Sequence, residues 1–383
     1  MSALPASNAL RPKSFSGWAL SPAIELDNAT PSFLTFIFLA SSLKRQAIFS
    51  ALAALTREGP ESLAARLRSL APTDCHSDQN PHEEIARALL TTSRAREIVR
   101  AVYGEAPDGL LGMLSRIGAE PLCEPDLYFR LFETFADPQH RMRRDVLRRR
   151  SGSITATQIE IVHHLEPVLV HGNILRHIYS ISQAESANAA LALVRGTVSF
   201  ATDDVIRQSI ENLGEKTDLA EFFNRWLQKM DNPPACPPIP KDDPDVAVMT
   251  SGEAMASLGR RFRNCSTTRI VYIAQGAEAL LEWKRPPGLV AQCHRLTNGG
   301  WVLTQIYARD NGRVDPAEAG VFRRKLESLG VLALSPGEFY PNASGVLTLL
   351  GAWGGVGRNL GFDGIEEEFD ELERDIAEIG DAA

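Results

Sequence analysis

A cluster of prolines between residues 233 and 244 constrains the fold of this chain more than any other feature of its sequence. Six residues of this segment are proline. Each proline lacks a backbone N–H donor and restricts the residue before it, so no helix or central strand can continue through such a segment. The chain has 383 residues, which is more than one hydrophobic core usually serves. We therefore predict a proline-rich linker at residues 232–247 that separates two structural regions.

Helical patterns dominate the residues before the linker. Asn80 can cap a helix that opens at Pro81, where the missing N–H donor costs nothing. Apolar residues then recur with a period of about 3.6 residues until Gly104, which is a stop signal. Similar patterns follow, without a fixed-length repeat. We predict an all-helical domain at residues 32–231, preceded by an irregular segment at residues 1–31 that is rich in Ser, Pro, Asn and Ala.

Strand patterns follow the linker. The strand-like runs are Ala279–Trp283, Leu289–Leu296 and Trp301–Ala308. An Asn-Gly pair at residues 298–299 is a strong hairpin signal, and the capping residues Ser251 and Asp315 predict helices before and after the strands. We predict a small α+β module with an antiparallel sheet at residues 248–350, then a glycine-rich hinge and an acidic tail at residues 351–383. The predicted fold class is a mostly α N-terminal region followed by this module.

Cysteine usage and hydropathy indicate the compartment. The five cysteines are scattered without a Cys-x-x-Cys pair, which argues against a disulfide framework and a structural zinc site and fits a reducing compartment. The most apolar run, Phe33–Leu43, is about half as long as a membrane helix and leads into two basic residues. We predict a cytoplasmic protein with no metal, no cofactor and no membrane partner. Four histidines lack the spacing of a zinc motif and are interpreted as structural: His163, His164, His171 and His177.

Asn264 and Cys265 form the most concentrated chemical signal. A thiolate at Cys265 could act as a nucleophile, with Asn264 and Gln305 as polar support, and nearby arginines would lower the pKa of the thiol. The alternative is that Cys265 is a small buried hydrophobe, as single cysteines usually are. Cys293 and His294 are adjacent on a predicted strand, so their side chains point to opposite faces. We interpret His294 as a half-buried strand histidine.

A dense run of arginines lies between residues 141 and 150. Its predicted nucleic-acid-binding members are Arg141, Arg143, Arg144, Arg148 and Arg149. If the run is helical, three of them share a face that could neutralise phosphates. The first interpretation is a solvated helix face, the second is contact with nucleic acid, and the third is docking of the acidic tail. Residues 363–383 contain ten acidic residues and one basic residue, so the tail carries the acidity of a chain whose formal charge is −8.

Residues of the second module resemble the PcfJ-like proteins, a bacterial family of conjugative plasmids and other mobile elements. The matching residues are Thr250-Ser251-Gly252-Glu253, Leu258-Gly259-Arg260, Arg263-Asn264-Cys265, Tyr272 and Gly276, followed by Gln305 and Asn311. The resemblance covers about residues 248–330, and its motif is short and degenerate. It implies a role with mobile DNA or its host conflicts, and a site built from Asn264, Cys265, Tyr272, Gln305 and Asn311. Asn264 stands where many relatives carry histidine, and because an amide does not titrate, a Cys–His mechanism is in doubt.

Three functional hypotheses remain open. The first is a bacterial mobile-element accessory or defence-related protein, whose α+β module binds or processes a nucleic-acid-related ligand. The second is a cysteine-dependent enzyme that uses Cys265. The third is a non-enzymatic adaptor whose helical domain binds a protein partner. Whether the chain is an enzyme, and its oligomeric state, are left open by the sequence.

Overall fold

The computed structural model describes residues 12–70, 80–92, 94–214, 216–264, 266–312 and 314–333. By contacts within the chain it divides into two compact units. The first unit is Met1–Asn188 with Ile206–Glu215, and the second is Ala189–Val205 with Lys216–Ala383. The proline-rich segment falls inside the second unit by this division, and the predicted domain boundaries stay predictions. The predicted hinge and acidic tail, residues 351–383, lie outside the described residues.

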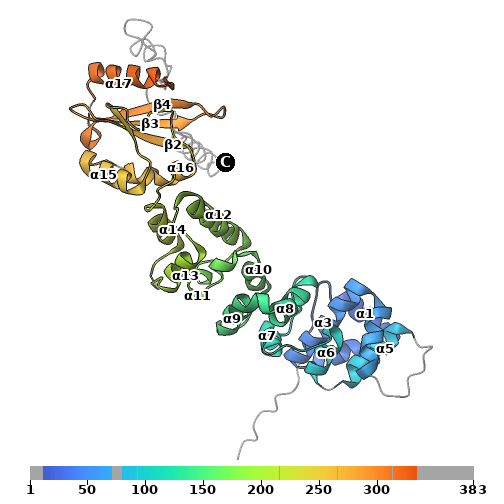
Figure 1. Cartoon of the computed structure of the whole chain (residues 1–383). Coiled ribbons are helices and arrows are strands. Elements are labelled where there is room, and N and C mark those ends of the chain that lie inside the picture. Colours follow the sequence, from blue (N-terminus) through green and yellow to red (C-terminus); the bar gives the residue numbers. More distant parts are fainter. Residues whose placement is uncertain are drawn as a thin grey trace, which may run out of the picture. The chain divides into compact units, whose positions relative to one another are not determined.

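The described residues before the proline-rich segment are helical, as predicted (Figure 1). The α-helices are α1 (Leu20–Ala29), α2 (Phe33–Leu39), α3 (Ser42–Glu58), α4 (Pro60–Leu67), α5 (Pro81–Thr91), α6 (Ala95–Tyr103), α7 (Leu110–Ile117), α8 (Asp126–Ala136), α9 (Arg141–Arg149), α10 (Ala156–His164), α11 (Gly172–Leu175), α12 (Ile181–Thr197), α13 (Asp203–Glu211) and α14 (Leu219–Leu227). Short 3-10 helices are η1 (Arg68–Leu70), η2 (Pro138–His140) and η3 (Pro167–Leu169). The Phe33–Leu43 run forms α2 and the start of α3, and among the described residues no helix combines the length and apolar composition that a membrane span requires.

Helix signals in the sequence act where they were expected, with two differences. The Asn80 side chain accepts a hydrogen bond from the backbone N–H of His82, and α5 begins at Pro81. The pattern that runs to Gly104 is split into α5 and α6, because Thr92 leaves the helical conformation. The segment 1–31 is not irregular throughout, since α1 buries Ala23 and Leu26. A short apolar face was enough to order this helix.

The C-terminal module holds one five-stranded sheet. Its elements are β1 (Val246–Val248), α15 (Gly252–Phe262), η4 (Ser266–Arg269), α16 (Ile270–Ala274), β2 (Glu278–Trp283), β3 (Leu289–Arg295), β4 (Trp301–Tyr307), η5 (Arg309–Asn311), α17 (Pro316–Ser328) and β5 (Val331–Ala333). The strand order is β1-β2-β3-β4-β5, and the first four strands pair antiparallel. Strand β5 pairs parallel to β4, so the predicted antiparallel sheet is mixed at one edge. The crossover through α17 brings the chain back in the same direction.

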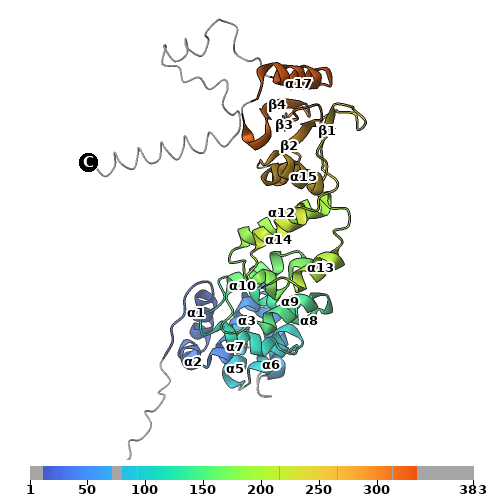
Figure 2. The same ribbon diagram turned by 90° about the vertical axis from the view of Figure 1, so that its left-hand side faces the viewer.

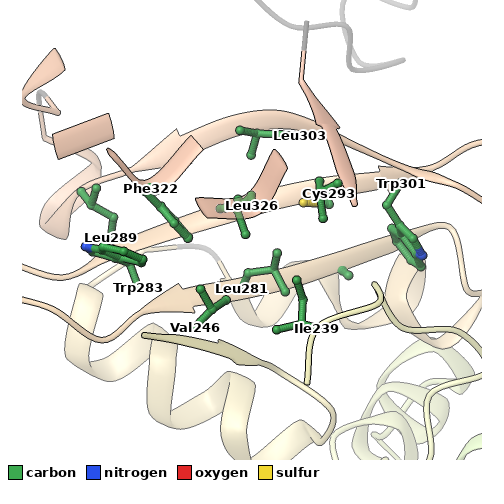
Figure 3. Packing of buried hydrophobic residues seen from close by; sticks show 13 residues of the cluster. Ile239, Val246, Leu281, Trp283, Leu289, Cys293, Trp301, Leu303, Phe322 and Leu326 are labelled. Atoms are coloured by element: carbon green, nitrogen blue, oxygen red, sulfur yellow. The ribbon is translucent and has the colours of Figure 1, made fainter. Parts of the chain in front are cut away.

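The sheet carries helices on both faces, with α17 on one and α15 and α16 on the other (Figures 1 and 2). Figure 3 shows the core between the sheet and α17, where the Trp283 and Phe322 ring centroids lie 4.9 Å apart. Cys293 is fully buried in this core, and its burial raises the pKa of the thiol to about 12. The α15–α16 face holds the polar side chains described below.

An ion pair and a hydrogen bond hold the proline-rich segment against the C-terminal module. The carboxylate of Asp243 lies 2.8 Å from Lys325 Nζ, and its backbone carbonyl accepts a hydrogen bond from Lys284. Where α15 begins, the N–H of Gly252 donates to the carbonyl of Met230. A Cβ atom at Gly252 would stand 2.0 Å from the backbone oxygen of Gln228, so only glycine fits this approach.

Candidate ligand-binding site

A β-bulge aims two polar side chains of β4 at the α15–α16 face. Gln292 pairs with Gln305, but Cys293 pairs with Leu303, so Thr304 is the extra residue. Trp301 and Leu303 face the α17 core, and strict alternation would put Gln305 there too. The bulge reverses the alternation, so Gln305 and Tyr307 emerge on the face of Gln292.

An open cavity lies on this face. It has a volume of about 260 Å³, which includes open solvent. Its lining residues come from the α15–η4 connection, from β2, β3 and β4, and from η5. They are Asn264, Ser266, Arg269, Leu280, Val290, Gln292, Tyr307 and Asn311. Segments as far apart in the sequence as η4 and η5 therefore build one site.

Tyr307 holds two glutamines of the cavity face together. Its hydroxyl lies 2.7 Å from Gln292 Oε1 and 2.8 Å from Gln305 Oε1. A hydroxyl carries one proton, so it can donate to only one of these oxygens at a time. The other glutamine can pair by turning its amide, so that its NH₂ group donates to the tyrosine oxygen. Because Gln292 is buried and Gln305 is exposed, we assign the tyrosine proton to Gln292.

Gln292 also joins the cavity to a buried charge. Its Nε2 lies 3.3 Å from His294 Nε2, which lies 3.5 Å from Glu278 Oε1. The carboxylate of Glu278 is only 3% exposed, and Arg269 Nε lies 3.3 Å from its other oxygen. His294 Nε2 can accept from Gln292 when it carries no proton, and can donate to Glu278 when it does. The tautomer of the ring therefore decides which of these two side chains Nε2 can hydrogen-bond.

The rim of the cavity contains unusual backbone. Among the described residues, four other than glycine have a positive φ, and three of them lie here: Arg263 (48°), Asp310 (57°) and Asn311 (51°). Such a conformation is uncommon without glycine and persists only where the surroundings hold it, often at functional sites. Arg263 directly precedes Asn264, and Asp310 directly precedes Asn311, so both strained segments present a cavity-lining amide.

The residues predicted from the sequence divide into three groups. Asn264 and Asn311 line the cavity, and Gln305 reaches it through Tyr307. Tyr272 is 41% exposed and is not a lining residue, although the Arg269 guanidinium lies 5.1 Å from its ring centroid. Cys265 lies outside the described residues.

Sequence reasoning missed Gln292 and Tyr307, and it considered Arg269 only as one of the arginines near Cys265. Gln292 gave a usable signal, because an amide in the middle of an otherwise apolar strand must find a buried partner. Tyr307 gave none, since the face on which it lies depends on the bulge.

The arginine run forms α9 in the first unit, and its members differ. The Arg143 guanidinium donates to the carbonyls of Val162, His163 and Leu165 at 3.0 to 3.4 Å, at the C-terminal end of α10. Arg144 is only 25% exposed and lies 3.7 Å from Asp145. The exposed members are Arg141, Arg148 and Arg149. Arg143 is therefore a helix-capping residue, and the predicted nucleic-acid contact is left to the exposed three.

His163 lies beside this cap. Its Nε2 lies 2.8 Å from Thr134 Oγ1, and burial followed by the nearby charge of Arg143 lowers its pKa to about 4. In the part of the chain that the structure describes, no group of three or more His, Cys, Asp or Glu side chains is placed to hold a metal ion.

A scan against protein-family models matches no family, and searches of the curated proteins and of the solved structures find no match. The resemblance to PcfJ-like proteins therefore rests on the residues quoted above and stays a prediction.

Proposed function

We propose that the α+β module binds a nucleic-acid-related ligand and holds a nucleobase in the cavity on the α15–α16 face. The observation that supports this most is the convergence of Asn264, Asn311 and the Tyr307-bound Gln292 around the aliphatic side chains of Leu280 and Val290. The Asn311 amide offers a donor and an acceptor side by side, as the edge of a base requires. The Asn264 amide offers its NH₂ group, because its oxygen accepts from the N–H and hydroxyl of Ser266. The aliphatic side chains suit the face of a planar ring.

The cavity is open to solvent, so a base bound at it would leave the sugar and phosphate outside.

The charge of the cavity favours an uncharged group inside. Among the described lining residues, Arg269 is the cation, and its guanidinium faces the buried carboxylate of Glu278. The other polar side chains of the described lining are amides and hydroxyls. Little net charge therefore remains at the cavity floor, which suits a neutral base better than a phosphate.

The wider setting follows from the motif. The resemblance of residues 248–330 to PcfJ-like proteins supports an accessory or defence-related role with bacterial mobile elements. A cytoplasmic location and a protein partner of the helical region belong to the same proposal.

Binding of the four common nucleosides to the full chain, measured by calorimetry or chemical-shift changes, tests the proposal. We expect at least one nucleoside to bind, and Gln292→Leu to weaken binding by about tenfold, because the amide that positions Tyr307 is then replaced by an apolar group in the cavity wall. Gln228→Leu makes the same change on the exposed surface of the same unit and is the matched control. Asn311→Gly removes a second amide where glycine suits the backbone. The proposal fails if no nucleoside binds, or if both cavity variants bind as wild type does.

A second candidate function is chemistry at Cys265, because Asn264 and Ser266, its neighbours in sequence, both line the cavity. Thiol labelling of the native protein at several pH values, read out for each cysteine by mass spectrometry, tests it. A reactive thiol well below the ordinary pKa of about 8.5 would support an enzyme. The internal reference is Cys293, which should stay unlabelled until the protein unfolds, since it is buried and its thiol pKa is raised. Protection of Cys265 equal to that of Cys293 would refute the enzyme.

A further inference from the structure

The rim of the cavity carries a second recognition element beside the amides. Arg263 Nη1 and Arg309 Nε lie 3.9 Å and 3.8 Å from the two oxygens of one carboxylate, that of Asp310. The three side chains are 66%, 60% and 55% exposed. Two cations around one anion leave a net positive charge at the rim.

These ion pairs are weak and can be exchanged. Both distances exceed those of a hydrogen bond, and pairs this exposed usually contribute about 0–1 kcal/mol. The guanidinium groups are thus not committed to Asp310. A phosphate group can take its place, because Arg binds phosphate oxygens with two parallel donors.

The rim adjoins the cavity directly. Arg263 is one residue from Asn264, and Arg309 is two residues from Asn311. Consecutive Cα atoms are about 3.8 Å apart, so these side chains start within a few ångströms of the lining amides. The packing of α15 against η5 brings the two segments together. The left-handed backbone conformation at Arg263 and Asp310 sets the direction in which the side chains of these two segments point away from the backbone.

We propose that Arg263 and Arg309 bind the phosphate of the nucleotide whose base enters the cavity, and that the carboxylate of Asp310 occupies the phosphate position between them when no ligand is bound. This inference rests on the proposed function and adds the ligand class, since it predicts a preference for nucleotides over nucleosides. The phosphate can be the terminal group of a mononucleotide or a phosphodiester within a single strand. Both present the same oxygens to the rim.

The test compares three ligands of the full chain at low salt: a nucleoside, its 5′-monophosphate, and a single-stranded tetranucleotide of the same base. We expect one or both phosphate-bearing ligands to bind about five- to tenfold tighter than the nucleoside, an advantage that added salt removes. A tight monophosphate identifies a terminal phosphate, and a tight tetranucleotide alone identifies a phosphodiester.

Matched variants keep the backbone intact. Arg263→Asn and Arg309→Gln remove one charge each, and asparagine tolerates the left-handed conformation. Together they should abolish the phosphate advantage while nucleoside affinity stays unchanged. Asp310→Asn removes the competing carboxylate and should tighten nucleotide binding about threefold. Arg225→Ala is the control, because this α14 arginine is equally exposed at 60%, pairs with Glu221, and does not line the cavity.

The outcomes separate the two proposals. If nucleosides and nucleotides bind equally well, or if Arg225→Ala weakens nucleotide binding as much as the rim variants, the phosphate rim is refuted and the base cavity stands. If no ligand binds, the base cavity fails and the rim fails with it. Weaker nucleotide binding by Asp310→Asn would also refute the rim, because that carboxylate would then be needed for binding.

Discussion

The arginines of α9 and those at the cavity rim form two basic regions that differ in their spacing along the sequence and in what their guanidinium groups contact. On α9 they are adjacent along the chain, yet Arg143 binds backbone carbonyls of α10 and Arg144 is three-quarters buried beside Asp145. At the rim, Arg263 and Arg309 are far apart along the chain, yet they share one exposed carboxylate. The denser run thus contributes fewer available cations than its sequence indicates.

The difference lies in what each guanidinium binds. The last carbonyls of a helix have no partner within the helix, and a guanidinium can satisfy several of them at once. A residue in that role cannot also bind a phosphate. A run of basic residues therefore predicts a nucleic-acid-binding surface only for those side chains that do not already donate hydrogen bonds to backbone carbonyls nearby.

Removing Arg143 should have the largest effect on stability. Arg143→Ala leaves the half-buried carbonyls of Val162 and Leu165 without their donor, at an expected cost of about 2–3 kcal/mol. Arg148→Ala, on the exposed part of the same helix, should cost less than about 0.5 kcal/mol. Urea denaturation of the two variants measures the difference. Equal stability of the two variants would contradict the capping role, because Arg143 would then be as available as its neighbours.

The same pair of variants separates stability from nucleic-acid binding. If α9 contacts nucleic acid, Arg148→Ala should lower the salt dependence of binding by about one phosphate contact while the fold is kept. Unchanged binding by a variant that also lacks Arg141 and Arg149 would show that the helix is a solvated face, which is the first interpretation of the sequence.

The fold could be predicted from local signals because those signals agree with the packing. The hairpin at residues 298–299, the three central strands and the cap at Asp315 all lie where the sequence indicates. Strand β5 could not be predicted, since three residues give no periodicity and its parallel pairing depends on where α17 packs.

The site could be predicted only in part. Asn264 and Asn311 were predicted because they match a motif, whereas Tyr307 depends on a bulge that no alternation pattern shows. Gln305 was predicted as polar support for Cys265 and by the motif, and its position beside Tyr307 is a consequence of the same bulge. A β-bulge moves the residues after it to the opposite face of the sheet, and the strict two-residue alternation of a strand cannot predict such a change.

The two units should lose stability in acid over different pH ranges. The pKa of His163 is lowered to about 4, so the unfolded chain takes up a proton at higher pH than the folded one. Stability of the first unit should therefore fall as the pH drops from about 6.5 to 4, by about 1–2 kcal/mol after allowance for solvent screening of this half-buried group. His163→Gln cannot titrate and should remove this part of the loss.

The second unit should lose stability at lower pH than the first. Hydrogen bonds from Lys325 and Arg285 lower the pKa values of Asp243 and Asp245, so the stability they give is lost only below about pH 4, where the unfolded carboxylates are protonated. Hydrogen exchange resolved along the chain distinguishes the two windows. The assignment to His163 is wrong if the Gln variant loses protection in the first unit over the same range as wild type.

The smallest expected effect tests how the cavity is held. Tyr307→Phe removes the hydroxyl shared by two glutamines and should cost about 1 kcal/mol. A double-mutant cycle with Gln292→Leu should give a coupling of about 1 kcal/mol, and one with Gln305→Leu about 0.3 kcal/mol, because only the buried amide receives the tyrosine proton in a water-poor setting. If the two couplings are equal, the proton is shared with the exposed glutamine and Gln292 is free to turn. The amide that faces the ligand would then be set by the ligand, and the cavity would accept bases with either edge pattern instead of selecting one.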